Sequence, residues 1–220
     1  MNRNTFILIS TWLTLLIVTI HASDALSLDT SFSGDGRVTL SFTAGDDVGS
    51  GIAVQSDDKI VVVGTTDDLR NTWLAVARFT VNGSLDTSFG VDGTVISISS
   101  SNGDDMGSGN ALQSDDRTVL VGSSDDGSGK WRFVVARFNI NASFPDPAID
   151  SGKATTSFST GDDVGSGIAV QSDDKIVVVG TADDGSGDSQ FAVARYISDL
   201  SFNGGGGGDG GGGGGGGGGG

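Results

Sequence analysis

Short apolar runs, separated by clusters of Gly, Asp, Ser and Asn, make up most of the chain after residue 25. The runs are brief and rich in β-branched residues, which is typical of strands, and no sustained helical period of apolar residues follows residue 25. The pattern therefore predicts strands joined by tight turns. The first four predicted strands are Arg37–Phe42, Gly51–Gln55, Lys59–Thr65 and Trp73–Thr80.

The fourth run alternates small and large residues. Ala75 and Ala77 fall on one face of the predicted strand, whereas Leu74 and Val76 fall on the other. The small residues would let a neighbouring sheet pack closely. Ser56–Asp58 is predicted to join the second and third strands as a hairpin.

The same set of runs occurs three times. Gly45–Thr65 and Gly161–Thr181 are identical over 21 residues, and Gly103–Ser123 is a looser copy. The units span residues 28–84, 85–143 and 144–201, with a step of 58 residues. Four antiparallel strands in a unit of this length are about one propeller blade. The predicted fold is all-β, with three four-stranded antiparallel propeller-like blades forming a partial or open β-propeller.

The acidic residues are all Asp, 28 of them, and the formal charge of the chain is −16. Asp favours turns, so its abundance agrees with many short strands. The negative charge argues against a nucleic-acid partner, which requires a basic patch, and against an anionic membrane surface. It permits the binding of cations.

The chain has no Cys, and its one His is His21. His21 lies in a segment that we expect to be removed, so Ser-His-Asp and Cys-His catalysis are excluded from the mature chain. We therefore expect a protein that is not an enzyme. A carboxylate-dependent, glycan-active enzyme is the alternative, for which Asp146, Asp150 and Asp188 are the unrepeated carboxylates.

The two ends of the chain differ from the repeats. Residues 1–25 have the layout of a secretory signal peptide: Arg3, then the largely apolar run Phe6–Ile20, then small residues. The alternative is an uncleaved anchor, but the run is shorter than the ~20 residues of a membrane span. We expect a secreted, periplasmic or cell-surface protein with no membrane span in the mature chain. Residues 204–220 are predicted to be a disordered poly-Gly tail.

Three ordered motifs resemble the delta-60 repeat family. They are Leu85–Gly93 (LDTSFGVDG), Ala53–Gly64 (AVQSDDKIVVVG) and Ala75–Phe79 (AVARF). The resemblance covers residues 28–202 and implies a β-propeller of unknown function. The chain departs from the family pattern at the hairpin, where Ser-Asp-Asp-Lys replaces Pro-Asp-Gly-Lys, and at 144–152, where the third unit begins differently.

Residues that recur in every unit are expected to be scaffold, so departures from the repeat are the candidates for function. Lys130, Trp131 and Arg132 have no equivalent in the third unit, and an exposed Trp between two cations could stack on a sugar or a peptide. The alternative is an ordinary strand aromatic. The repeated Arg78, Arg137 and Arg195 could line a channel, or could bond a nearby Asp or carbonyl.

Calcium is the cofactor that the Asp-rich loops suggest. Asp183, Asp184 and Asp188 place three carboxylates in six residues, and Ca²⁺ prefers such oxygen ligands. The alternative is that Asp closes turns through local bonds, with no cofactor at all.

Three blades are fewer than the four to eight of a closed propeller. Three explanations are open: the sequence is a fragment, the arc stays open with capped ends, or two chains join as a homodimer with a six-bladed ring. The leading hypothesis is a secreted or envelope-associated, non-enzymatic scaffold that binds an unknown protein or glycan. A calcium-stabilised surface adhesion module is the second hypothesis.

Overall fold

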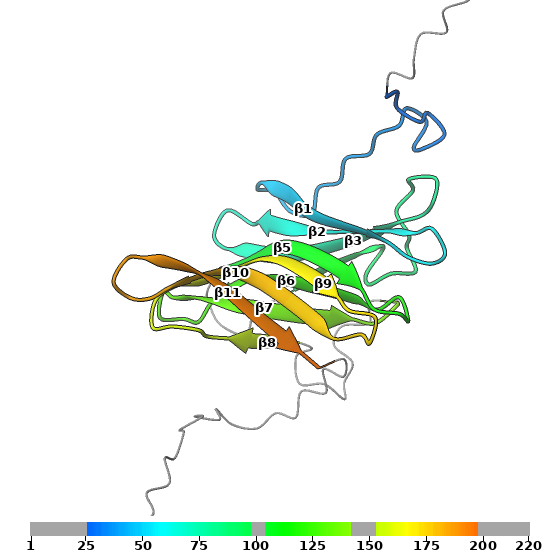
Figure 1. The fold of residues 1–220 in the computed structure, drawn as a ribbon. Coiled ribbons are helices and arrows are strands. Elements are labelled where there is room, and N and C mark those ends of the chain that lie inside the picture. The colour runs from blue at the N-terminus through cyan, green and yellow to red at the C-terminus, as the bar shows by residue number, and fades with distance from the viewer. Residues whose placement is uncertain (1–25, 98–103, 142–152, 198–220) are drawn as a thin grey trace, which may run out of the picture.

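The computed structural model describes residues 26–97, 104–141 and 153–197, and these residues form eleven strands and no helix. The strands make three antiparallel sheets (Figure 1). The first sheet runs β1 (Asp47–Val54), β2 (Ile60–Asp67), β3 (Thr72–Phe79), β4 (Thr94–Ser97). The second runs β5 (Asp105–Leu112), β6 (Thr118–Asp125), β7 (Trp131–Phe138), β8 (Lys153–Thr156). The third runs β9 (Asp163–Val170), β10 (Ile176–Asp183), β11 (Ser189–Tyr196).

The sheets stack in chain order, and their first strands meet along one side. β5 contacts β1 on one side and β9 on the other, so the middle sheet is flanked by the other two. Each first strand is followed outward by the second and third strands of its own sheet. This arrangement confirms the predicted all-β, open, propeller-like fold.

The outer strand of a sheet comes from the next sequence unit. β4 follows the turn at Asp92 and Gly93, which opens the second unit, yet it pairs with β3 of the first sheet. β8 pairs with β7 in the same way.

The prediction of a strand at Arg37–Phe42 was wrong, since that segment is extended but pairs with no strand in the described part of the chain. It precedes the first sheet, so no preceding sheet is there to receive it.

The third sheet has three strands among the described residues, not the predicted four. The sequence that would supply a fourth strand follows Tyr196 and lies outside the described ranges. The predicted signal peptide at 1–25, the poly-Gly tail at 204–220, the start of the third unit at 144–152 and the carboxylates Asp146 and Asp150 also lie outside them.

The core lies between the sheets, where a face with large residues packs on a face with small ones. Leu74 and Val76 of β3 are buried against Val134 and Ala136 of β7. One unit later, Phe133 and Val135 of β7 pack on Ala192 and Ala194 of β11. In the later units, the residues at the positions of Ala75 and Ala77 thus face the large residues of the preceding sheet. The role predicted for Ala75 and Ala77 themselves stays a prediction, because no other described sheet packs on their face.

The hairpins between first and second strands join neighbouring sheets. In the first hairpin the Asp58 N–H donates to the carbonyl of Gln55, and Asp58 takes a positive φ of 61°. This confirms the predicted turn. Asp116, its equivalent in the second sheet, accepts hydrogen bonds from the backbone and hydroxyl of Ser56. Asp174 of the third sheet accepts the same bonds from Ser114, at 2.8 and 2.5 Å.

Glycine at the 58-residue step is a packing requirement. A Cβ added to Gly64, Gly122 or Gly180 would overlap the carbonyl oxygen of the paired first strand, at Val48, Met106 and Val164 respectively. These glycines therefore let the first strand lie close against the second. A register shift in the first strand, between Gly49 and Gly51 in β1, accompanies each close approach.

We predict that Gly122→Ala lowers the free energy of unfolding by more than about 2 kcal/mol, because a backbone strand has to move to admit the methyl group. Gly109→Ala is the matched control. Its added Cβ would lie 3.8 Å from Ile168, an ordinary contact, so a change within about 0.5 kcal/mol is expected. Urea unfolding followed by circular dichroism measures both, and equal losses would contradict the packing argument.

Candidate functional site

All three sheets line one groove of about 490 Å³, which runs along their first strands. Each sheet contributes the same short stretch of its first strand, an apolar residue followed by Gly and Ser. These stretches lie one repeat apart, so they stand side by side in β1, β5 and β9. The lining residues are Val48, Ser50, Thr65, Met106, Gly107, Ser108, Val164, Gly165 and Ser166.

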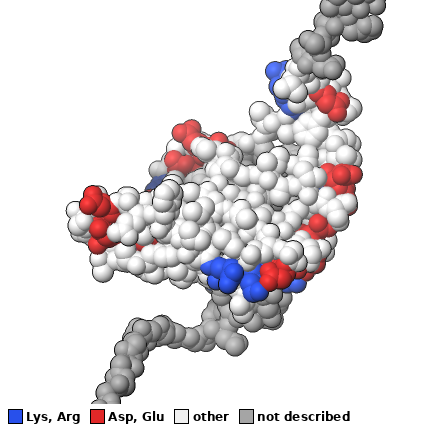
Figure 2. All heavy atoms as spheres, in the orientation of Figure 1, with Lys and Arg blue, Asp and Glu red and all other residues white. Residues whose placement is uncertain are grey.

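Hydroxyl groups are the polar side chains of this groove, and no charged side chain lines it in the part of the chain that the structure describes. The hydroxyl of Thr65 already has a partner within the protein, because its Oγ1 accepts a hydrogen bond of 3.1 Å from the Gly107 N–H. Ser50, Ser108 and Ser166 show no side-chain hydrogen bond within the described ranges, so their hydroxyls are available to a ligand. In Figure 2, charged side chains lie toward the margins of the molecule, and most of the surface between them is uncharged.

Arg78 lies away from the groove, in a buried network between the first two sheets. Its Nε donates to Asp86 Oδ2 at 2.8 Å, its Nη2 donates to Ser88 at 3.1 Å, and its Nη1 donates to the carbonyl of Ile140. The guanidinium also lies 4.7 Å from the centre of the Phe89 ring. The interpretation of Arg78 as a partner of a nearby Asp and carbonyl is confirmed. Arg137 is likewise buried, whereas Arg195 is exposed.

The same network sets the charge state of Asp86. Burial opposes ionisation of this carboxyl, but hydrogen bonds from Ser88 and the charges of Arg78 and Lys59 outweigh it and lower the pKa of Asp86 to about 2. Asp86 is therefore ionised in the folded protein at any ordinary pH. Its carboxylate joins the start of the second unit to the first sheet.

Lys130, Trp131 and Arg132 form a link between the second and third sheets. The Trp131 N–H donates to Asp162 at 3.1 Å, and Arg132 donates to the carbonyl of Gly161 at 2.5 Å. Arg132 also pairs with Asp126 at 3.0 Å, and Lys130 lies 4.0 Å from Asp162. The structure thus brings these three residues together at a junction between sheets, outside the groove, and their role in ligand binding stays a prediction.

The acidic loop at Asp183, Asp184 and Asp188 is a turn closed by its own carboxylates. Asp183 accepts from the Gly185 N–H, and Asp184 accepts from the N–H and hydroxyl of Ser186. The Asp184 N–H donates to the carbonyl of Asp188. Within the described ranges, no group of three or more acidic or imidazole side chains is placed to hold a metal ion.

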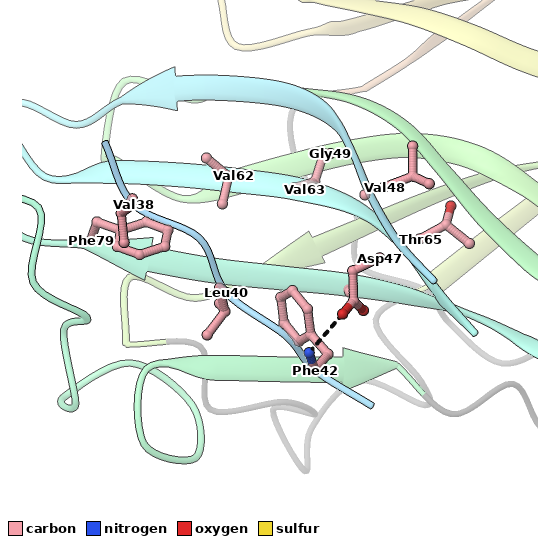
Figure 3. Close-up of a pocket in the computed structure, with 12 residues that line it drawn as sticks. Val38, Leu40, Phe42, Asp47, Val48, Gly49, Val62, Val63, Thr65 and Phe79 are labelled. Carbon is pink, nitrogen blue, oxygen red and sulfur yellow. Dashed lines mark hydrogen bonds between the residues drawn. The ribbon is translucent and has the colours of Figure 1, made fainter. Parts of the chain in front are cut away.

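A second cavity, of about 290 Å³, lies at the N-terminal end of the stack. Figure 3 shows the extended segment with Val38, Leu40 and Phe42 crossing in front of the first sheet. The Phe42 N–H donates to Asp47 Oδ2 at 3.1 Å, as the Phe158 N–H donates to Asp163 at 2.9 Å two units later. The cavity is the space between this segment and the sheet.

Sequence reasoning missed the groove serines because it assigned repeated residues to the scaffold. It also missed Asn110, which stands where the other units have Ile52 and Ile168. Asn110 Nδ2 donates to the carbonyl of Val61 at 3.3 Å, and its Oδ1 is buried without a hydrogen-bond partner among the described residues. A comparison of the three units position by position would have found it.

A family model supports the propeller architecture. A family model described as a β-propeller domain of unknown function, DUF5122, matches residues 55–89, 113–143 and 171–203. No curated protein sequence matches the chain. A solved structure of an endo-arabinase from Bacteroides thetaiotaomicron aligns with a TM-score of 0.40 and 11% identity, over 70% of this chain. The chain spans 57% of the length of that protein. No helix in the described residues is long and apolar enough to cross a membrane.

We predict that the stabilising effect of Asp86 is lost in acid. The lowered pKa means that the folded state resists protonation more than the unfolded state, so the contribution is complete above about pH 5 and disappears as the pH falls toward 2. The shift from 3.8 to about 2 corresponds to about 2 kcal/mol. The difference in unfolding free energy between the natural chain and Asp86→Asn should therefore shrink by that amount between pH 6 and pH 2.

Asp92→Asn is the matched control, since Asp92 is an exposed carboxylate in the next turn of the same segment and Asn tolerates its positive φ of 51°. Urea titrations at several pH values provide the measurement. A difference for Asp86→Asn that is independent of pH would show that the charge of Asp86 does not stabilise the junction.

Proposed function

We propose that the protein is a secreted or envelope-associated, non-enzymatic scaffold of three delta-60-type repeats that binds an uncharged ligand in the groove along β1, β5 and β9. One observation carries the proposal: the groove presents three equivalent serines, Ser50, Ser108 and Ser166, between apolar side chains. Its volume, about 490 Å³, is typical of ligand-binding sites.

The chemistry of the lining favours a neutral, hydroxyl-rich ligand. A serine hydroxyl can both donate and accept a hydrogen bond, which suits the hydroxyls of a glycan. Val48, Met106 and Val164 provide apolar surface beside each serine. An anionic ligand would meet no cation in this lining, and a cationic ligand would meet no carboxylate.

The absence of titratable groups from the groove lining supports binding over catalysis. General acid–base chemistry needs a side chain that exchanges a proton near neutral pH, within hydrogen-bond reach of the substrate. The nine lining residues include none. The function that fits this groove is recognition, with the bound molecule released unchanged.

The test is binding of the full chain to an array of neutral glycans, followed by titration of the best ligand. Ser108→Asp, which places a charge at the centre of the groove, should weaken binding about tenfold or more by leaving a desolvated charge beside the ligand. Thr87→Asp is the control, because it adds the same charge at an exposed turn outside the groove, and it should change the affinity less than about twofold.

Two outcomes would contradict the proposal. Equal losses from Ser108→Asp and Thr87→Asp would place the ligand elsewhere. Release of shortened products from a bound glycan would favour the carboxylate-dependent enzyme instead.

A further inference from the structure

The two ends of the stack carry matching halves of the contacts that join its sheets. At each internal junction the tail face of one sheet packs on the head face of the next. The tail face carries the large residues (Leu74 and Val76, then Phe133 and Val135), and the head face carries the small ones (Val134 and Ala136, then Ala192 and Ala194). No other sheet packs on the tail face of the third sheet or on the head face of the first sheet among the described residues, and the segment with Val38, Leu40 and Phe42 crosses that head face. We propose that two copies of this chain close head to tail into a six-bladed ring.

The hairpin contacts show the first matching pair. Ser56 bonds Asp116 and Ser114 bonds Asp174, as described above. The next serine in the series is Ser172, and the first aspartate is Asp58. Both are exposed, neither has a side-chain hydrogen bond in the described ranges, and Asp58 has the same positive φ of about 60° as Asp116 and Asp174. In the ring, Ser172 bonds Asp58 of the partner subunit.

Buried ion pairing gives the second matching pair. Arg78 binds Asp86 and Ser88 at the start of the following unit. In the first unit Asp29 and Ser31 occupy the equivalent positions and form the same local bonds, the Ser31 hydroxyl donating to Asp29 at 2.6 Å. Asp29 has no cationic partner in the described ranges, and exposed Arg195 has no carboxylate partner there. Arg195 and Asp29 of the partner subunit complement each other in charge and position.

Apolar surface gives the third matching pair. Phe133 and Val135 are both 0% exposed in the middle sheet, whereas their equivalents Phe191 and Val193 are 96% and 60% exposed. On the head side, the cavity of about 290 Å³ lies on the face of the first sheet that has no preceding sheet. Phe133 meets Phe158 at 4.8 Å, and the equivalent contact in the ring joins Phe191 to Phe42 of the partner subunit, in that cavity.

The extended segment Arg37–Phe42 completes the interface as a strand. Residues at its position in later units, Thr94–Ser97 and Lys153–Thr156, pair with the third strand of the preceding sheet. β11 is an edge strand among the described residues, with β10 as its neighbour. In the ring, the first residues of the partner's segment become the fourth strand of the third sheet, which gives every sheet four strands.

The number of copies follows from the number of blades. The described residues form three sheets, which is below the four to eight that close a propeller, and two copies give six. A head-to-tail contact gives a closed ring when repeating the same rotation brings the last copy back onto the first. A half-turn does this after two copies, so two identical interfaces related by a two-fold axis form the ring. The proposal concerns the ends of the stack and does not depend on the ligand of the groove.

The first experiment measures the mass of the full chain by light scattering over a range of concentrations. We expect twice the mass of one chain. Phe191→Asp should weaken the dimer about 100-fold or more, since it places a charge at the centre of each interface. Gly49→Ala should weaken it about tenfold or more. The added Cβ meets nothing within 4 Å in one chain, but at Gly107 and Gly165 it would meet a carbonyl of the preceding sheet at 2.5 Å.

The second experiment is cross-linking, which the absence of natural cysteine makes specific. A chain with Ser172→Cys and Asp58→Cys, treated with a short bismaleimide, should give a covalent dimer. The control chain with Ser114→Cys and Asp174→Cys has the same geometry within one subunit. It should be cross-linked within one chain, without forming a covalent dimer. Ser172→Cys alone should give no head-to-tail product.

Several results would overturn the ring. A strictly monomeric chain at micromolar concentration, with the control pair cross-linked and the Ser172–Asp58 pair not, would rule out the interface. A ladder of larger products would show an open filament. A dimer unaffected by either Phe191→Asp or Gly49→Ala would show that another surface associates.

Discussion

A sheet that is apolar on both faces has to stand between two neighbours, and this constraint governs the whole stack. The middle sheet satisfies it, because Phe133 and Val135 pack against the third sheet while Val134 and Ala136 pack against the first. The residues alternate along β7, so one strand contributes to both interfaces. Large residues on one face and small ones on the other allow the same strand sequence to fit its own copy one unit away. Similar units therefore suit this packing, because each sheet has to fit the next.

Turn chemistry explains why the acidic residues are Asp throughout. Asp57, Asp126 and Asp184 each accept a hydrogen bond from the backbone N–H two residues later in the chain. The short side chain of Asp reaches that N–H without distorting the turn, which accounts for its preference at such positions. Asp116 and Asp174 add a second role, since their carboxylates bond the hairpin of the preceding sheet. The high negative charge follows from the number of turns.

Local features were predictable from the sequence, and pairings between units were not. The sequence close to each feature accounts for β2 and β3, for the hairpin at Ser56–Asp58 and for the bond from Arg78 to Asp86. The bond from Arg78 to the carbonyl of Ile140 depends on the neighbouring sheet. The position of Arg37–Phe42 depends on a neighbouring sheet, because an isolated run of this kind forms a strand only where an edge is available to pair with it. The groove serines were overlooked for a different reason. One groove contains Ser50, Ser108 and Ser166 because their three strands lie side by side. The spacing of the residues along the sequence does not show which strands become neighbours.

Whether a residue recurs in every unit therefore does not decide whether it is structural or functional. The role of a residue depends on the place of its sheet in the stack. Ser114 and Asp174 hold two sheets of one chain together, while Ser172 and Asp58 present the same groups to solvent. A formal charge of −16 on each chain opposes association of two copies at long range, and salt screens that repulsion beyond about 10 Å. Short-range contacts then decide the outcome. The end faces offer the same kinds of contact that join the sheets within one chain: a hydroxyl with a carboxylate, a guanidinium with an aspartate, and exposed apolar side chains with an apolar cavity.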